Sequence, residues 1–307
     1  MTDYFTNPVF GKTSPSLSVL IPFFKDDASG LISDLAAQNC SKPFEVILVD
    51  DGSKQDDLTN RLQTLMADLP VEVCLITLAE NEGRASARNH LQQSARSDWL
   101  LFLDADMRPA DSNFLESYLE EISRNEADII FGGFNVEGQS QDKDGALHRA
   151  LSAVSDCLPL SQRQAAGPQY VASSNLCLRK AVIEKDPFDR GFVGWGWEDS
   201  EWAARVSKKY KLIHIDNPAL HLGLESADTL LQRFRTSGAN YVRFTEKHPE
   251  LAKTLTLYRL SKTLKKTPGQ KLCRPFLKWI VKSKAPMRAR LMALRLWRAS
   301  WYAEAIK

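Results

Sequence analysis

Two carboxylates one residue apart, Asp104 and Asp106, directly follow the apolar run Trp99–Leu103. A short apolar run of this kind predicts a strand buried on both faces of an α/β sheet. Ligands bind beyond the carboxyl ends of such strands. Because alternate residues of an extended chain point to the same side, both carboxylates are expected to face one site. Two hard oxygen ligands suit Mg²⁺ or Mn²⁺, which can hold a phosphate; the alternative is a polar strand end before the turn at Pro109.

The elements that would position these acids alternate along the first third of the chain. Strands are predicted at residues 17–24, 44–49, 71–78 and 99–103, and helical stretches at 27–38 and 56–68, with a loop leading into a helix over 81–95. This alternation predicts βαβ units and a mostly parallel central sheet flanked by helices. Right-handed crossovers would bring the strand ends, with their polar residues, to one edge.

Further polar residues collect at this predicted edge. Asp50 and Asp51 end the second strand, and Asn81 and Arg88 belong to the following loop and helix. Carboxylates can accept hydrogen bonds from a base or a ribose, and arginine can pair with a diphosphate, so we expect a nucleotide site. The alternatives are a plain turn at Asp51 and a solvated helix face at Arg88. The glycine motifs of ATPases and dinucleotide-binding enzymes are absent from the sequence.

A glycine- and tryptophan-rich loop precedes an acidic helix start in the second half. Strands are predicted at 127–134 and 170–178 and helical stretches at 144–165 and 179–184. The loop then carries Trp195 and Trp197 ahead of Glu198 and Asp199. Flat apolar rings suit the C–H faces of a sugar, whereas the alternative is two core tryptophans. Acids at a helix start are also favoured by capping and by the helix dipole, which is the structural alternative for Glu198 and Asp199.

Two histidines follow in the segment KLIHIDNPALHLG. His214 lies within an apolar run, which favours a core histidine. His221 comes after the run, shortly before Gly223.

Charge is distributed unevenly between the two ends of the chain. Residues 253–307 hold 15 Lys and Arg and one acid, Glu304, a net charge of +14, and the other 25 basic and 37 acidic residues give −12. After a helical stretch at 228–247, the basic tail mixes Lys and Arg with Trp, Leu and Phe, which is typical of a helix lying on anionic lipid. The alternative is a basic helical cap packed on the acidic body. Nucleic-acid-binding motifs are absent, so we expect no nucleic-acid partner.

Cysteine usage and hydropathy indicate the compartment. The five cysteines are odd in number and widely spaced, without a Cys-x-x-Cys pair, so reduced thiols are expected. The N-terminus has no apolar core typical of a secretory signal, and no apolar stretch reaches the roughly 18 residues of a membrane span. We therefore expect a cytoplasmic protein, peripheral on the inner face of the cytoplasmic membrane.

The ordered motifs SVLIPFFKD, EVILVDDGS, NEGRASARN and WLLFLDADM resemble the nucleotide-binding half of family 2 glycosyltransferases, which have the GT-A fold. The resemblance covers residues 17–110. It implies that Pro22 and Asp50 lie near the nucleobase and that Asp104 meets the ribose or the metal. It further implies that Asp106 coordinates the metal and that Arg88 lies close to the donor diphosphate.

The Gly-Trp-Gly and Glu-Asp pair at residues 194–199 resembles the catalytic motif of β-1,4-galactosyltransferases and chondroitin-type polymerases. By this resemblance Asp199 is the general base, Glu198 binds the acceptor, and His221 joins Asp106 as a metal ligand. An imidazole ligand fits Mn²⁺ better than Ca²⁺.

These observations predict a metal-dependent, inverting glycosyltransferase. It would move a sugar from a nucleotide-diphosphate sugar, most simply UDP-linked, to a saccharide or lipid-linked saccharide in bacterial surface polysaccharide or lipid-linked oligosaccharide synthesis. We expect a lead-in at 1–16, a GT-A domain at 17–226, divided at 110, and a basic helical extension at 227–307. The alternatives are a sugar-1-phosphate nucleotidyltransferase, which needs a glycine-rich loop that IPFFKDDASG lacks, and a non-catalytic carbohydrate-binding protein.

Overall fold

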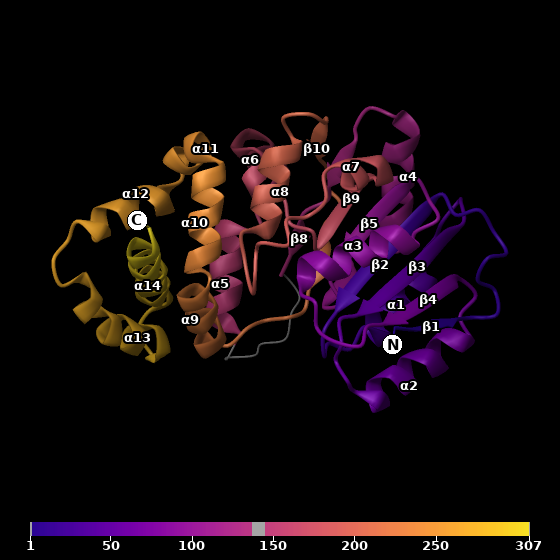
Figure 1. Ribbon diagram of the computed structural model, residues 1–307, viewed down its shortest axis with the longest axis horizontal. Helices are drawn as coiled ribbons and strands as arrows, with labels where there is room; N and C mark the ends of the chain where they lie inside the picture. Colours follow the sequence, from indigo (N-terminus) through magenta and orange to yellow (C-terminus); the bar gives the residue numbers. More distant parts are fainter. Residues whose placement is uncertain (1, 137–144, 307) are drawn as a thin grey trace.

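The computed structural model describes residues 2–136 and 145–306 (Figure 1). Within these residues a large eight-stranded sheet forms the centre of the α/β part, and a smaller three-stranded sheet lies beside it. In spatial order the large sheet consists of β1 (Asp3–Thr6), β4 (Glu72–Thr77), β3 (Phe44–Asp50), β2 (Leu17–Phe23), β5 (Trp99–Leu103), β9 (Asn175–Arg179), β7 (Ile129–Phe131) and β10 (Leu212–His214). The small sheet consists of β6 (Met107–Pro109), β11 (Ala219–His221) and β8 (Phe134–Asn135).

The large sheet is mostly parallel, as predicted. Strands β4, β3, β2 and β5 pair in parallel, and β10 pairs in parallel with β7. Strand β9 runs antiparallel between β5 and β7, and β1 runs antiparallel on the outer edge of β4. The segment expected to be a loose lead-in therefore contributes an edge strand.

Helices cover both faces of this sheet because its buried strands are apolar on both sides. Within β2, Val19 and Ile21 join one core layer and Leu20 joins the other. The first layer is completed by α1 (Ser29–Ala36), α2 (Asp56–Ala67) and α4 (Phe114–Arg124). The second is completed by α3 (Arg84–Ser94), α7 (Lys180–Lys185) and α8 (Glu198–Val206). The α/β architecture predicted from the alternating pattern is confirmed.

The second half is more broken than its sequence pattern indicated. The predicted strand at 127–134 is divided into β7 and β8 at Gly132, where any side chain would overlap Tyr118 and Asn175. The strand predicted at 170–178 begins only at Asn175, after a 3₁₀ turn at Pro168–Tyr170. The predicted helix at 144–165, whose first residue lies outside the described residues, is two helices, α5 (Ala146–Ser155) and α6 (Leu160–Ala166). They separate at Pro159, whose ring cannot continue a helix.

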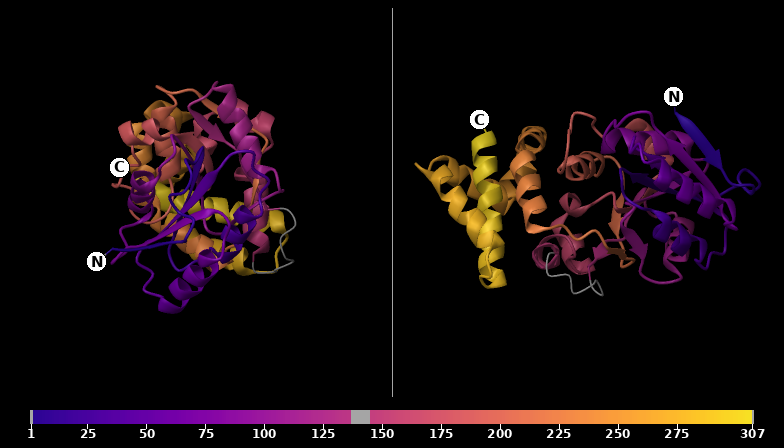
Figure 2. Two further views of the ribbon diagram at one scale, coloured as in Figure 1. Left: turned by 90° about the vertical axis from the view of Figure 1, so that its right-hand side faces the viewer. Right: turned by 90° about the horizontal axis from the view of Figure 1, so that it is seen from below.

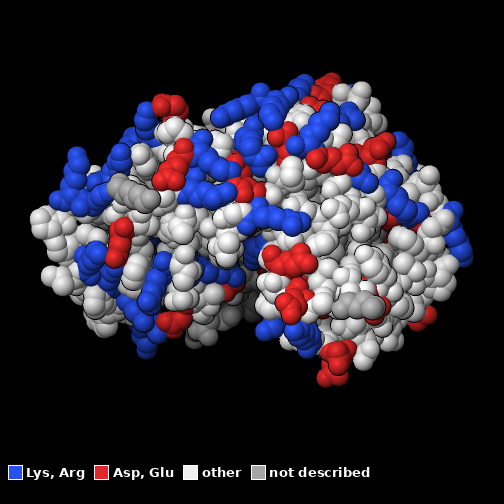
Figure 3. Space-filling model, in the orientation of Figure 1, with Lys and Arg blue, Asp and Glu red and all other residues white. Residues whose placement is uncertain are grey.

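A helical extension follows β11 and forms one end of the elongated molecule (Figures 1 and 2). The predicted single helix at 228–247 is two helices that separate at Ser237. The extension comprises α9 (Ala227–Thr236), α10 (Gly238–Lys247), α11 (Pro249–Thr254), α12 (Thr256–Lys265), the 3₁₀ turn Gln270–Cys273, α13 (Arg274–Lys282) and α14 (Met287–Ala305). Lys and Arg side chains are frequent over this end in the space-filling view (Figure 3).

The extension is packed onto the rest of the chain through a separate apolar cluster. Helix α14 contributes Leu294 and Trp297, which meet Leu231 and Phe234 of α9 and Leu147 of α5. This packing matches the predicted alternative of a helical cap for α14. Across the described parts of the chain, every helix is too short or too polar to cross a bilayer.

Candidate active site

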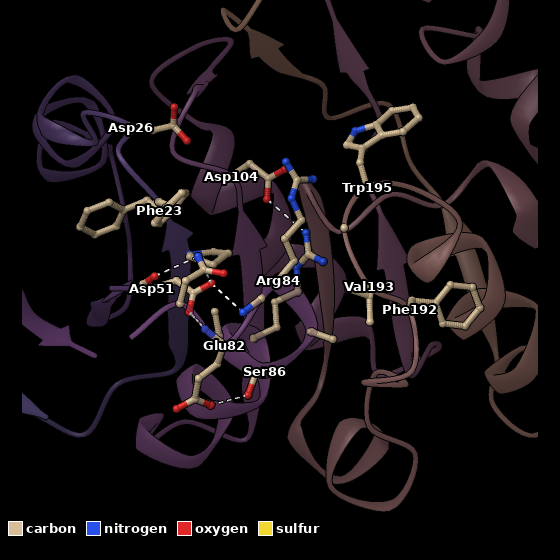
Figure 4. Close-up of a pocket in the computed structure, with 18 of the residues that line it drawn as sticks. Phe23, Asp26, Asp51, Glu82, Arg84, Ser86, Asp104, Phe192, Val193 and Trp195 are labelled. Carbon is tan, nitrogen blue, oxygen red and sulfur yellow. Dashed lines mark hydrogen bonds and ion pairs between the residues drawn. The ribbon is translucent and has the colours of Figure 1, made fainter. Parts of the chain in front are cut away.

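A cavity of about 680 Å³ opens at the carboxyl ends of β2, β3 and β5. We call it the sheet-edge cavity. Figure 4 shows Phe23 and Asp26 on one side, Trp195, Val193 and Phe192 on the other, and Arg84 and Asp104 between them. Most residues expected to bind a nucleotide sugar line it, namely Pro22, Asp51, Asn81, Arg88, Asp104 and Asp106. The parallel strands thus bring together the polar residues that follow them.

Asp51 holds the loop that borders this cavity. Its carboxylate accepts backbone hydrogen bonds from Glu82 at 2.7 Å and Gly83 at 2.9 Å, and a side-chain hydrogen bond from Asn81 at 3.0 Å. Burial raises the pKa of Asp51 in spite of these bonds. Asp50 is more deeply buried, and its carboxylate accepts the N–H of Ser53 at 2.9 Å. Both acids therefore shape the two loops, and Asp50 lies behind the cavity wall.

A second cavity of about 530 Å³ adjoins the first, and we call it the helix-side cavity. The two share five lining residues, Arg84, Asp104, Asp106, Trp195 and Arg233. The second is also lined by Glu198, Asp199 and His221, and by Leu257 and Arg298 of the helical extension. The predicted nucleotide-binding acids and the predicted catalytic acids thus face two compartments with a common wall.

Asp106 and His221 form a pair on this common wall. The Oδ2 atom of Asp106 lies 3.2 Å from Nε2 of His221. Burial alone would lower the pKa of His221, but the hydrogen bond and charge of Asp106 outweigh it and raise that pKa. Burial alone would raise the pKa of Asp106, and His221 lowers it. Gly223 lies directly against the Asp106 carboxylate, and a Cβ atom there would displace that carboxylate from its present position.

Asp106 and His221 supply two ligands that suit a divalent cation, and a substrate would supply the other ligands. Within residues 2–136 and 145–306, no group of three or more His, Cys, Asp or Glu side chains is arranged to hold a metal ion. Mg²⁺ and Mn²⁺ in phosphate-transfer sites are commonly held by one or two protein ligands together with phosphate oxygens. Asp106 and His221 would then release the proton that they share and bind the cation in its place.

Arg88 lies almost fully buried in the wall of the sheet-edge cavity. Its side chain is only 1% exposed, and its guanidinium approaches Asp104 at 3.4 Å, Asp199 at 3.5 Å and Glu198 at 3.9 Å. Burial would lower the pKa of Arg88, but these three carboxylates raise it, with Asp199 the strongest. Arg88 thus joins acids of both cavities, and Arg84 on the same helix is the arginine that lines both.

Asp199 and Glu198 begin helix α8 in different environments. Asp199 accepts two hydrogen bonds from Ser173, from N–H at 3.0 Å and from Oγ at 2.9 Å. Glu198 is buried, and its Oε2 atom has no hydrogen-bond partner among the described residues. Burial, and then the neighbouring charge of Asp199, raises the pKa of Glu198. Asp199 is therefore oriented by fixed donors, whereas Glu198 retains an unpaired oxygen next to the helix-side cavity.

The two tryptophans of the glycine-rich loop differ in their contacts. Trp195 lines both cavities and packs against Phe234 with ring centroids 5.7 Å apart. Trp197 has φ = 77°, an uncommon conformation for a residue with a large side chain. Its Nε1 donates to Tyr302 Oη at 3.0 Å, and its ring packs against Phe244. Trp197 thus attaches the loop to the helical extension while it also lines the helix-side cavity.

The structure adds residues that the sequence analysis did not select. Asp26 lines the sheet-edge cavity, and burial followed by the charge of Asp106 raises its pKa; its place after the first strand was a usable signal. Arg233 of α9 lines both cavities. The ring of His148 lies 5.6 Å from that of His221, and burial followed by the charge of His221 lowers its pKa to about 4. Long-range packing places these two side chains, and no local motif marks them.

Comparisons with known proteins agree with this geometry. The family model described as Glycosyl transferase family 2 matches residues 18–185. The chain is 26% identical over 238 residues to the uncharacterised glycosyltransferase YfnE of Bacillus subtilis, covering 62% of this chain and 59% of that protein. It is 27% identical over 213 residues to polypeptide N-acetylgalactosaminyltransferase 12 of the mouse, covering 62% of this chain and 37% of that protein. The chain thus spans less than two thirds of the length of these relatives.

Solved structures share the fold at low identity. The complex of Staphylococcus aureus TarS residues 1–349 with UDP-GlcNAc has a TM-score of 0.55 and 16% identity, and the match covers 94% of this chain and 90% of that one. The mannosyltransferase PcManGT from Pyrobaculum calidifontis, in complex with GDP-Man and Mn²⁺, has a TM-score of 0.57 and 14% identity, and the match covers 95% and 87%. Because the family model matches more than half of the sequence, the chain belongs to the family 2 glycosyltransferases, and it has the GT-A fold.

Proposed function

We propose that this transferase moves a hexose or N-acetylhexosamine from a UDP-sugar to a saccharide hydroxyl, with inversion at the anomeric carbon and with the help of Mn²⁺ or Mg²⁺. The observation that carries the proposal is the common wall of the two cavities. Asp104 and Asp106 face both compartments, and Asp199 lines the helix-side cavity. A donor in one compartment and an acceptor in the other would meet there.

The sheet-edge cavity is the proposed donor site. Asp104 is placed to accept hydrogen bonds from the ribose, and Pro22 borders the position of the base. Arg84 and Arg233, which line both compartments, supply positive charge for the diphosphate. Arg88 is almost fully buried in the wall of this cavity, so we assign it a positioning role: it fixes Asp104 and Asp199 relative to each other.

The helix-side cavity is the proposed acceptor site. Trp195 offers an apolar ring at the junction of the two compartments, and Glu198, which lines this cavity, is the proposed acceptor-binding carboxylate. Asp199, held by Ser173, is the proposed general base. Trp197 contributes to the wall of the cavity and holds the loop in place.

The reaction is a single displacement. Asp199 takes the proton of the acceptor hydroxyl while that oxygen forms a bond to the anomeric carbon. The bond from the same carbon to the diphosphate oxygen breaks on the opposite face, UDP leaves with the bonding electron pair, and the configuration is inverted. Asp106 and His221 would hold the cation, which when bound supplies positive charge for the departing diphosphate.

The helical extension supports a proposal about location. We assign residues 17–226 to a GT-A domain, divided near residue 110, and 227–307 to a basic extension that contacts anionic lipid. In this proposal the enzyme works at the inner face of the cytoplasmic membrane, in the synthesis of bacterial surface polysaccharide or of a lipid-linked oligosaccharide. The net charge of +14 over residues 253–307 is its basis.

A donor-hydrolysis screen tests the proposed activity. The protein is incubated with UDP-galactose, UDP-GalNAc, UDP-glucose, UDP-GlcNAc and UDP-glucuronate, with and without Mn²⁺, and released UDP is measured. We expect metal-dependent release from one donor, with weak or no release from the others. Calorimetric titration with UDP and Mn²⁺ accompanies the screen. If the protein neither binds UDP nor releases it from any donor, the assignment of UDP as the nucleotide is wrong.

A further inference from the structure

Three large apolar side chains project from the outer side of the α13 region. Leu272, Phe276 and Trp279 are 84%, 60% and 64% exposed. The rings of Phe276 and Trp279 stack on each other with centroids 5.8 Å apart and planes 17° apart. Residues three positions apart lie on one side of a helix, so Phe276 and Trp279 share a face of α13, and Leu272 is exposed in the 3₁₀ turn directly before it. We call these three residues the apolar ridge.

The opposite side of α13 is firmly packed, so the ridge is not a product of a loose helix. Val281 is fully buried, and Leu277 and Ile280 pack against the cluster that contains Leu294 and Trp297 of α14. Arg274, also buried, donates from Nε to Ser300 Oγ at 2.8 Å. This side fixes the rotation of α13 and leaves the apolar ridge directed outward.

The surroundings of the apolar ridge are strongly basic. Lys271, Lys278 and Lys282 belong to the same short segment. Lys282 is paired with Asp228 of α9, and Lys278, between Phe276 and Trp279 in the sequence, is exposed. The single acid among residues 253–307, Glu304, is paired with Lys271 and Arg274. Large apolar side chains bordered by lysines match the boundary between acyl chains and anionic headgroups.

We infer that the apolar ridge inserts into an anionic lipid bilayer, with the neighbouring lysines on the headgroups. The inference deepens the proposed location of the enzyme and rests on it. A second copy of this chain is a poorer occupant of the ridge, because two extensions that each carry +14 repel each other when they meet face to face. A bilayer surface rich in anionic lipid supplies the missing opposite charge.

The position of the ridge suits an acceptor that is anchored in the same membrane. The extension occupies one end of the molecule, away from the nucleotide-binding strands (Figure 1). The same extension lines the helix-side cavity through Leu255, Leu257 and Arg298. Docking through α13 would therefore hold the proposed acceptor cavity near the membrane while the donor cavity stays with the rest of the catalytic domain.

Vesicle sedimentation with the full chain tests this inference. Binding is compared between phosphatidylcholine vesicles and vesicles that also contain phosphatidylglycerol, for the wild type and for the double variant Phe276→Ser and Trp279→Ser. We expect the wild type to bind the anionic vesicles only, and the double variant to lose about tenfold or more in affinity. Lys278→Glu should also weaken binding to the anionic vesicles. This loss should be larger at low salt than at high salt, because salt screens the charge.

Matched controls lie at the other end of the molecule. Tyr4→Ser removes an aromatic ring that is 63% exposed on β1, and Lys12→Glu reverses an exposed charge of the N-terminal segment; both should bind vesicles as the wild type does. UDP binding with Mn²⁺ is measured on the same samples without vesicles, so a failed nucleotide assignment is separated from a failed lipid assignment. The inference is overturned if the wild type does not bind anionic vesicles, or if the double variant binds them as well as the wild type does. Self-association that the double variant abolishes would instead make the ridge a contact between copies.

Discussion

The two cavities share a wall but are built in different ways. Residues from strand ends and adjoining loops between Pro22 and Asp106 form most of the sheet-edge cavity. The helix-side cavity draws on segments from Arg84 to Arg298, including α5, the loop before α8 and three helices of the extension, α9, α12 and α14. One compartment is thus a property of the parallel sheet, and the other depends on how distant helices pack.

This difference indicates where a substitution can change substrate specificity with the least loss of stability. Strand ends are fixed by backbone ladders and by two core layers, so the side chains of the sheet-edge cavity are tied to the stability of the fold. Helix termini and loops around the helix-side cavity, such as Thr256 at the start of α12, can change with less effect on the core. We therefore expect substitutions on the two sides to separate into donor effects and acceptor effects.

Asp199→Asn gives the sharpest test of this separation. The amide keeps the shape of the carboxylate and a neighbour for Ser173, but it cannot take the acceptor proton. We expect turnover to fall by about a thousandfold, while UDP affinity stays unchanged in calorimetry with Mn²⁺. An active Asn variant would place the general base elsewhere. Loss of UDP binding would mean that the two sides are not independent.

Asp106→Ala tests whether the common wall contributes to metal-dependent donor binding. The variant leaves His221 without its carboxylate partner and removes one of the two proposed cation ligands. We expect metal-dependent UDP affinity to fall by about a hundredfold, and a chelator to produce a similar loss in the wild type. Asp68→Ala serves as the control, because Asp68 is an exposed carboxylate at the end of α2 that lines neither cavity. Unchanged UDP affinity of Asp106→Ala in Mn²⁺ would remove this residue from the metal site.

How much the sequence could predict follows the same division. The apolar run Trp99–Leu103 is bounded by polar residues and buried on both faces, so its strand and its terminal acids could be placed from local pattern alone. His148 and Arg233 carry no local signature, because the packing of α5 and α9 brings them to the helix-side cavity. The burial of Arg88 was equally hidden, since an arginine in a polar helix usually faces solvent.

Thr256→Trp tests whether the extension borders the acceptor. Thr256 is exposed at the start of α12 and lines the helix-side cavity, so a large ring there narrows the cavity without entering the core. We expect the acceptor KM to rise about tenfold with no change in UDP affinity. Thr254→Trp, at an exposed position two residues earlier that does not line the cavity, is the matched control. Equal kinetics of the two variants would separate the extension from the acceptor.

The smallest predicted effect concerns the two buried acids of α8 and their different partners. Glu198 has a raised pKa, caused first by burial and then by Asp199, whereas Glu201 is paired with Arg205 at 3.1 Å. A carboxyl whose pKa is raised on folding contributes most stability below its unfolded pKa, and this contribution is lost as the pH rises through the folded value. Glu198→Gln removes this penalty of the ionised form.

We therefore expect Glu198→Gln to be more stable than the wild type at pH 8 by about 1 kcal/mol, because the amide carries no charge that burial would disfavour. The difference should shrink towards pH 4, where the wild-type carboxyl is protonated. Urea unfolding at both pH values measures it. Glu201→Gln, on the same helix, should instead lose stability at pH 8, because it breaks an ion pair. A Glu198→Gln protein that is less stable than the wild type at pH 8 would show that attraction to Arg88 outweighs burial. The acid would then belong to the structural framework of the wall rather than to the part that is left open for an acceptor.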